Sequence, residues 1–165
     1  MYRARPPSDY PLHIVLYHPE IPPNAGNAGR TCVALGAKLW MVRPLGFEID
    51  NKHLRRAGID YWEHLDWEVV DDWESLTARL PQPYWYFSKS GRKTHLEAKF
   101  RRGDVLVFGS ESSGLPAEWA RAEPERFLRI PVGPKVRSLN LAVSVGVAAY
   151  EAWRQTGGFS VESNA

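Results

Sequence analysis

A short apolar run followed by a glycine-bracketed loop is the feature that most restricts how this chain can fold. Residues 104–108 read Asp-Val-Leu-Val-Phe, and residues 109–116 read Gly-Ser-Glu-Ser-Ser-Gly-Leu-Pro. A Val- and Phe-rich run of this length, bounded by glycine, is typical of a buried strand. A loop with a carboxylate at the end of such a strand is typical of a ligand-binding turn in an α/β sheet. The sequence therefore predicts a strand that ends at a binding site.

Two further segments have the same character. Residues 24–30 (Asn-Ala-Gly-Asn-Ala-Gly-Arg) follow an expected strand near the start, and residues 130–140 follow another near the end. The later segment reads Ile-Pro-Val-Gly and then runs into Arg-Ser-Leu-Asn. Because ligands in open parallel sheets bind beyond the carboxyl ends of the strands, we expect the three segments to converge.

The rest of the chain alternates between strand and helix patterns. We expect strands at 12–17, 38–42, 67–70, 84–88, 105–108 and 127–130, and helices at 24–35, 50–57, 72–80 and 116–121. Prolines predict a loop over 18–23, and Asn24 is a candidate helix cap, with Gly36 ending the helix. The segment from Leu139 alternates like a strand but continues to Gly157, and its length favours a helix. This alternation predicts the α/β class, with an open, mostly parallel sheet and flanking helices.

The length of 165 residues predicts one domain, which we place at 12–158. Residues 1–11 carry three prolines and two arginines without an apolar core, which predicts a disordered tail instead of a signal peptide, and 159–165 form a second tail. No run approaches the roughly 20 apolar residues of a membrane span. We therefore expect a cytoplasmic protein with no membrane partner.

Charge and cysteine content exclude several classes of protein. The net charge is only +2, although basic residues cluster at 52–56, 92–93, 99–102 and 135–137. Such clusters form either a local anion-binding face or ordinary solvated surface. Cys32 is the only cysteine, and the five histidines lack HExxH spacing, so neither a disulfide within the chain nor a metal site is expected.

The sequence does not match the common nucleotide-binding and hydrolase motifs. The spacing of Gly109 and Gly114 matches a P-loop, but Leu115-Pro116 stands where Lys and Ser or Thr are required. Residues 24–30 are not GxGxxG, and no GxSxG is present. A small-molecule α/β enzyme that uses a nucleotide is therefore disfavoured.

The three segments, in this order, resemble the three motifs of the SPOUT superfamily of RNA methyltransferases, in its SpoU (TrmH-like) branch. The resemblance extends over about 12–157, and residues 14–27, 46–61 and 150–155 are similar to the members that methylate tRNA nucleotide 34. It implies a C-terminal trefoil knot, a homodimer with sites at the interface and S-adenosylmethionine as methyl donor. The implied substrate is the wobble nucleotide of the tRNA anticodon stem-loop, methylated on its ribose 2′-hydroxyl. The alternatives are another tRNA or rRNA position, or a non-catalytic RNA-binding homologue.

The resemblance also implies roles for individual residues. The cofactor pocket would be lined by Phe87, Gly109, Ile130, Ser138, Leu139 and Asn140. The catalytic residues would be Arg30, Asn24 and Glu111, and RNA would contact Arg55, Arg56, Lys135 and Arg137. For Asn24, Glu111 and Asn140 the alternative is a structural role as a cap or turn residue.

Arg30 is the leading catalytic candidate. Arginine has an ordinary pKa of about 12.5–13.8, whereas a general base needs a pKa near the working pH. We therefore expect Arg30 to grip phosphate and stabilise oxyanion charge. Two positions depart from the family pattern: Ser113 stands where relatives often carry arginine, and Ala142 where a polar group is usual.

Overall fold

The expected strands form one sheet in the computed structural model, which describes residues 5–49 and 60–158. The strands are β1 (Leu12–Tyr17), β2 (Lys38–Val42), β3 (Trp67–Val70), β4 (Trp85–Phe87), β5 (Lys93–Thr94), β6 (Asp104–Phe108) and β7 (Phe127–Arg129). Their order is β3-β2-β1-β6-β4-β7-β5, and all the pairs are parallel. The α/β prediction is confirmed. The sequence did not predict β5, because a pair of residues carries no periodic signal.

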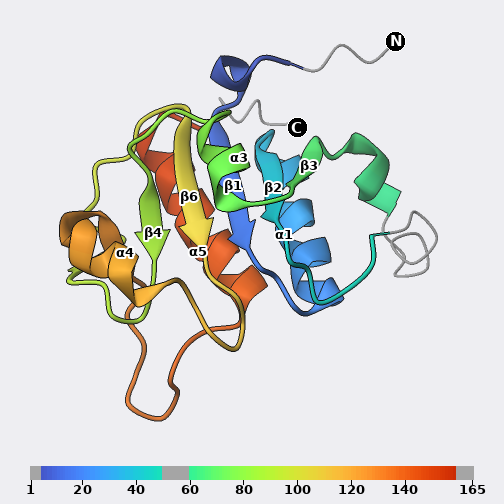
Figure 1. Ribbon diagram of the computed structural model, residues 1–165. Helices are drawn as coiled ribbons and strands as arrows, with labels where there is room; N and C mark the ends of the chain where they lie inside the picture. The colour runs from blue at the N-terminus through green and yellow to red at the C-terminus, as the bar shows by residue number, and fades with distance from the viewer. Residues whose placement is uncertain (1–4, 50–59, 159–165) are drawn as a thin grey trace.

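Helices cover both faces of the sheet (Figure 1). On β1, Ile14 and Leu16 point into one apolar layer and Val15 into the other, so the strand is buried on both sides. The first layer is covered by α1 (Pro22–Leu35), α5 (Leu141–Gln155) and the short 3₁₀ helix η2 (Asp60–His64). The second is covered by α3 (Trp73–Thr77) and α4 (Ala117–Ala122). Two further 3₁₀ turns are η1 (Pro7–Asp9) and η3 (Pro124–Arg126).

Helix α1 begins earlier than the sequence predicted. Pro22 and Pro23 are its first two residues, so the loop expected over 18–23 is too long and Asn24 is not the cap. Proline suits this place because the first helical N–H groups have no partner within the helix, and its fixed φ is already helical. The helix ends at Gly36, whose φ of 68° is left-handed, as predicted.

The other helices differ from prediction mainly in length. Helix α3 is shorter than the expected 72–80, although Asp72 caps it by accepting a 2.7 Å hydrogen bond from the Ser75 amide. The ambiguous last segment is helical, as its length favoured, and α5 stops before Gly157. The helix expected at 50–57 lies outside the described residues.

The segment before β1 is ordered by its contact with the sheet. Tyr10 is buried, and the Trp40 indole donates a 3.1 Å hydrogen bond to Nδ1 of His13. Because Nδ1 accepts, the proton lies on Nε2, which donates to the Pro7 carbonyl at 2.9 Å. Residues 7–10, which the sequence predicted to be part of a tail, thus contact the sheet. Residues 1–4 and 159–165 lie outside the described part of the chain.

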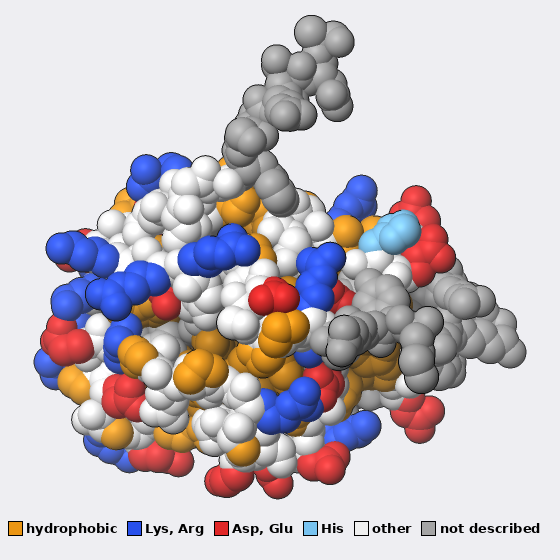
Figure 2. Space-filling model, turned by 90° about the horizontal axis from the view of Figure 1, so that it is seen from above, with side chains coloured by type: hydrophobic (Ala, Val, Ile, Leu, Met, Phe, Trp, Pro, Cys, Tyr) orange, Lys and Arg blue, Asp and Glu red, His pale blue; other side chains and the backbone are white. Residues whose placement is uncertain are grey.

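The strands run downward in Figure 1, and Figure 2 views the molecule from above, where they begin. Lysine and arginine side chains gather on the left of this face, with acidic side chains interspersed (Figure 2). Among the described residues, no helix is both long and apolar enough to cross a membrane.

Candidate active site

A cavity of about 950 Å³ lies at the carboxyl ends of β4, β6 and β7. Phe87, Phe108 and Arg129, the last residues of these strands, all line it. Its lining includes every residue that the sequence assigned to a cofactor pocket: Phe87, Gly109, Ile130, Ser138, Leu139 and Asn140. This location is the one expected for a ligand site in an open parallel sheet.

The loop after β6 forms a tight turn that only glycine permits. Ser110 and Gly114 form an isolated bridge, in which the Gly114 amide donates to the Ser110 carbonyl at 3.0 Å. A Cβ on Gly109 would lie 2.2 Å from the carbonyl carbon of Gly114, and Gly114 itself has a φ of 66°. Both glycines are therefore required by the backbone of the turn, which forms one wall of the cavity.

Glu111, at the tip of this turn, caps helix α1 from about 90 residues away. Its carboxylate accepts hydrogen bonds from the amides of Glu20 and Ile21, at 2.8 and 3.1 Å. It also accepts from Nδ2 of Asn24, at 3.2 Å. Ile21 is the cap residue of α1 and has no side chain that can satisfy these donors. A carboxylate at a helix N-terminus is also favoured by the helix dipole.

Asn24 and Asn140 extend this network to the third segment. Nδ2 of Asn140 donates to Oδ1 of Asn24 at 2.9 Å. The Oδ1 atom of Asn140 accepts from the amides of Ala142 and Val143, at 2.9 and 3.3 Å, and so caps α5. The predicted convergence of the three segments is thus observed as a hydrogen-bonded chain, Glu111–Asn24–Asn140. We call this chain the motif junction.

Arg30 lies on α1 but is not among the residues that line the cavity. Its exposed guanidinium stacks over the Tyr61 ring, 5.4 Å from the centroid. The Tyr61 hydroxyl donates to the Gly26 carbonyl at 2.8 Å, which fixes that ring against α1. Burial raises the pKa of Tyr61, so the phenol stays neutral and keeps this hydrogen bond. No pattern in the sequence indicated that Tyr61 supports Arg30.

The basic candidates separate into three groups. Arg137 lines the cavity, whereas Lys135 is exposed on the same 131–139 loop without lining it. Arg55 and Arg56 lie outside the described residues.

Sequence reasoning missed Ser88, Lys89 and Ser90, which also line the cavity. A signal was present, because these polar residues follow strand β4 just as the three motifs follow theirs.

Nothing in the described residues suggests a metal centre or a thiol nucleophile. No group of three or more His, Cys, Asp or Glu residues in this part of the chain could hold an ion. Cys32 is fully buried, and burial raises the pKa of its thiol far above the ordinary value.

Comparison with known proteins identifies the relatives of this site. The pattern of the SpoU rRNA Methylase family matches residues 11–150, which include all three segments of the junction. The chain belongs to the SpoU rRNA methylase family. A relative from Methylovorus glucosotrophus (strain SIP3-4), a tRNA (cytidine(34)-2′-O)-methyltransferase, is 46% identical over 144 residues, which are 86% of this chain and 94% of the relative.

Solved structures of SpoU-family methyltransferases share the fold. One of them, solved in work on the 2-OH methylation of C/U34 on tRNA, is 52% identical to this chain, with a TM-score of 0.80. The match covers 87% of this chain and 95% of that one. Another, an AdoMet-bound rRNA methyltransferase from Sinorhizobium meliloti, has 25% identity and a TM-score of 0.76. That match covers 92% of this chain and 61% of the other.

Proposed function

We propose that this SpoU-family protein transfers a methyl group from S-adenosylmethionine to the ribose 2′-hydroxyl of nucleotide 34 in tRNA. The observation that carries the proposal is the motif junction, which ties three distant segments together at one cavity. The choice of nucleotide 34 rests on relatives such as the Methylovorus enzyme, which is similar over most of its length. Cytidine and uridine are both candidate bases, since the related structure concerns C/U34.

The cavity suits S-adenosylmethionine in size and chemistry. Its volume of about 950 Å³ falls in the range of about 300–1,000 Å³ of small-molecule sites. Phe87, Ile130 and Leu139 offer apolar surface to a purine, and Ser88, Ser90 and Ser138 offer hydroxyls. Residues 131–139 form neither helix nor strand, so backbone groups of this loop can bind the ligand. When bound, S-adenosylmethionine would supply the methyl group.

Arg30 would act on the RNA and not on the methyl donor. Its delocalised charge and five donors fit a phosphate or a developing oxyanion. Because Arg30 does not line the cavity of its own chain, we propose that it serves the cavity of a second copy. This arrangement requires the homodimer, with sites built at the interface, that the family resemblance implies.

Helix α5 provides a face for that dimer. Val143, Val147 and Tyr150 are spaced four and three residues apart on one side of the helix, and they are 50%, 37% and 49% exposed. Apolar side chains at helical spacing bury their surface when another helix packs on them. We also retain the C-terminal trefoil knot as a proposal; the packing of α5 against α1, β1 and β6 after the long 131–140 loop supports it.

The anticodon stem-loop would bind around the cavity mouth. Lys89 and Arg137 line the cavity, and Lys135 is exposed on the same loop as Arg137. Phosphate contacts of such residues give affinity that falls with added salt. The protein would recognise the RNA sequence through the unstacked bases of the anticodon loop.

Labelled methyl transfer tests this proposal. The full-length protein is incubated with S-adenosylmethionine labelled in the methyl group and with separate tRNA and rRNA fractions. We expect label in tRNA only, in an alkali-resistant dinucleotide, because a 2′-O-methyl group blocks cleavage of the adjacent phosphodiester. Label in rRNA alone would overturn the tRNA assignment, and no label in either fraction would overturn the activity.

A further inference from the structure

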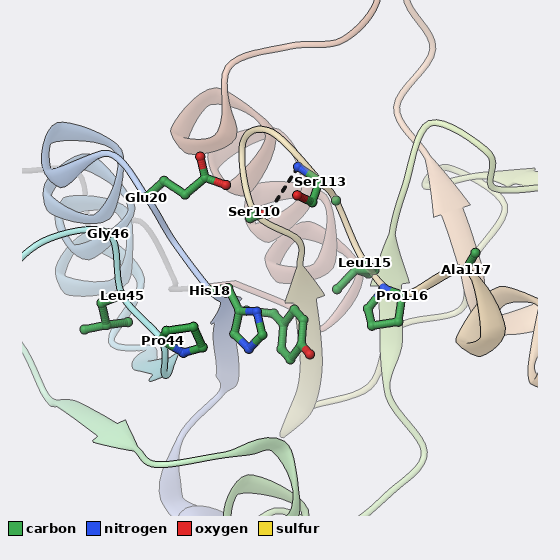
Figure 3. A pocket seen from close by; sticks show the side chains of 12 residues that line it. His18, Glu20, Pro44, Leu45, Gly46, Ser110, Ser113, Leu115, Pro116 and Ala117 are labelled. Carbon is green, nitrogen blue, oxygen red and sulfur yellow. Dashed lines mark hydrogen bonds between the residues drawn. The ribbon is translucent and has the colours of Figure 1, made fainter.

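A second cleft, of about 650 Å³, lies on the other side of the 109–116 turn. It opens between the ends of β1, β2 and β6, and six residues, Ser110 and 113–117, line both this cleft and the cofactor cavity. Figure 3 shows the His18 ring in the middle, with Pro44 and Leu45 on one side and Leu115 and Pro116 on the other. We call it the histidine cleft; the proposed methyl transfer gives it no role.

His18 is the end of an aromatic stack. Its ring lies on the Tyr17 ring, with centroids 3.7 Å apart and planes at 22°, and Tyr17 in turn contacts Trp119 at 5.0 Å. His18 also has a φ of 52°, an uncommon value for a residue other than glycine. Strained backbone of this kind is concentrated at ligand-binding sites. The strain here holds a flat ring within the cleft.

The walls of the cleft are fixed before any ligand arrives. The His18 amide donates to the Val42 carbonyl at 3.1 Å, and the Gly46 amide donates to the Pro19 carbonyl at 2.9 Å. A Cβ on Gly46 would lie 2.7 Å from Cα of Glu20, so the two loops touch along their backbones. A ligand would therefore meet a preformed slot, which lowers the entropic cost of binding.

The described lining of the cleft offers no cationic side chain to a phosphate. Among the described residues that line it there is no lysine or arginine, and Glu20 is the only acid. Hydrogen bonds from the Ser112 hydroxyl and backbone amide lower the pKa of Glu20, and the carboxylate is therefore ionised at neutral pH. Burial lowers the pKa of His18 as well, so its ring is mostly neutral there. A flat, uncharged group with N–H donors fits this combination.

We propose that the histidine cleft binds one unstacked nucleobase of the RNA, from a nucleotide next to the one that is methylated. The inference rests on the proposed function, and the shared 109–116 wall carries it: a nucleotide at the mouth of the cofactor cavity has its neighbour beside the cleft. The base stacks with the His18 ring, which itself lies on the Tyr17 ring. Stacking on aromatic side chains is how proteins hold splayed-out RNA bases.

The test uses anticodon stem-loops that carry the fluorescent base 2-aminopurine at one position on either side of nucleotide 34. Stacking quenches this fluorophore, so we expect wild-type protein to quench it at one of the two positions. His18→Asn keeps a residue that tolerates positive φ but removes the ring, and His18→Phe keeps a ring. We expect quenching to be lost in the first variant and retained in the second.

Kinetics with unlabelled RNA provide the second readout. We expect His18→Asn to raise the KM for RNA about 5- to 100-fold, the range of a lost base stack, with kcat and S-adenosylmethionine affinity within about twofold of wild type. His18→Gly, which accepts a φ of 52° without strain, should behave in the same way if the asparagine variant folds poorly. An unchanged KM in both ring-less variants, or no quenching by wild type at either position, overturns the proposal. A wild-type protein that methylates no RNA overturns the proposed function instead.

Discussion

At the scale of single residues, the site depends on side chains that use both of their polar atoms. Asn24 donates to Glu111 through Nδ2 and accepts from Asn140 through Oδ1, and Asn140 also caps α5. The sequence offered a cap or a catalytic group as alternatives for these residues. The structure gives them capping and bridging contacts at the edge of the cavity, so a change at one should affect stability and ligand binding together.

Glu111→Ala tests this coupling. The substitution leaves the amides of Glu20 and Ile21 and the Asn24 side chain without their acceptor. We expect the free energy of unfolding to fall by about 1–3 kcal/mol. Glu111→Gln keeps one acceptor oxygen, so its free energy of unfolding should fall by less. Urea denaturation measures both, and Glu63→Ala, on the exposed side of η2, should change stability by less than about 0.5 kcal/mol.

Arg30→Lys tests the bidentate role of the guanidinium. Lysine keeps the positive charge but loses the planar fork and its stack on Tyr61. We expect methyl transfer to fall about 10- to 100-fold while S-adenosylmethionine binding, measured by calorimetry, is unchanged. Arg79→Lys, beside the distant β3 edge, is the matched control. Near wild-type transfer by the Arg30 variant would contradict a need for the fork.

At the scale of elements, the sequence predicted the parts with a strong local signal. Strands β1, β2 and β3 match their predicted bounds, because short runs rich in aliphatic and aromatic residues, each followed by turn signals, leave little choice. The predicted start of α1 was wrong because the carboxylate that caps this helix belongs to Glu111, on a turn remote in sequence. No local sequence pattern reveals such a contact. The length of α3 and the two-residue strand β5 likewise depend on packing that the sequence does not display.

The three site segments show the same division. Their convergence followed from their position after strands, and all six predicted cofactor residues do line one cavity. Two other features could not be predicted from the sequence: the contact of Arg30 with Tyr61, and the histidine cleft. Each joins segments that meet only in the three-dimensional fold.

The contact between β1 and the η1 segment makes stability depend on pH. Burial lowers the pKa of His13 below its ordinary 6.5, and protonation of Nδ1 would break the hydrogen bond from Trp40. Between the folded and unfolded pKa values the unfolded chain binds more protons, so stability rises with pH. The contribution of His13 is therefore present above pH 6.5 and is lost as the pH falls below it.

His13→Gln isolates this effect. We expect the variant to be less stable than wild type at about pH 7.5 and to lose less stability on acidification to about pH 5.5. The part of the pH dependence due to His18, whose pKa is also lowered, should remain. Urea unfolding of both proteins at the two pH values measures the free energy of unfolding. If this free energy changed equally with pH in the variant and in wild type, His13 would not be the titrating group.

At the scale of the whole molecule, the proposed active site requires two copies of the chain. Val147→Asp places a charge in the middle of the exposed apolar face of α5. We expect this variant to sediment as a monomer at concentrations where wild type is a dimer, with methyl transfer reduced at least about tenfold. Leu96→Asp, at another exposed apolar position, should leave the dimer intact. A wild-type protein that is monomeric and fully active would contradict the shared site.

Mass spectrometric mapping identifies the methylated atom. The full-length protein and S-adenosylmethionine are incubated with an anticodon stem-loop, and with the same RNA carrying a single 2′-deoxy nucleotide at position 34. We predict one added methyl group on the ribose of nucleotide 34 in the first RNA and none in the second. Methylation of the deoxy-substituted RNA, or of any base or other ribose in the first RNA, would show that the 2′-hydroxyl of nucleotide 34 is not the target.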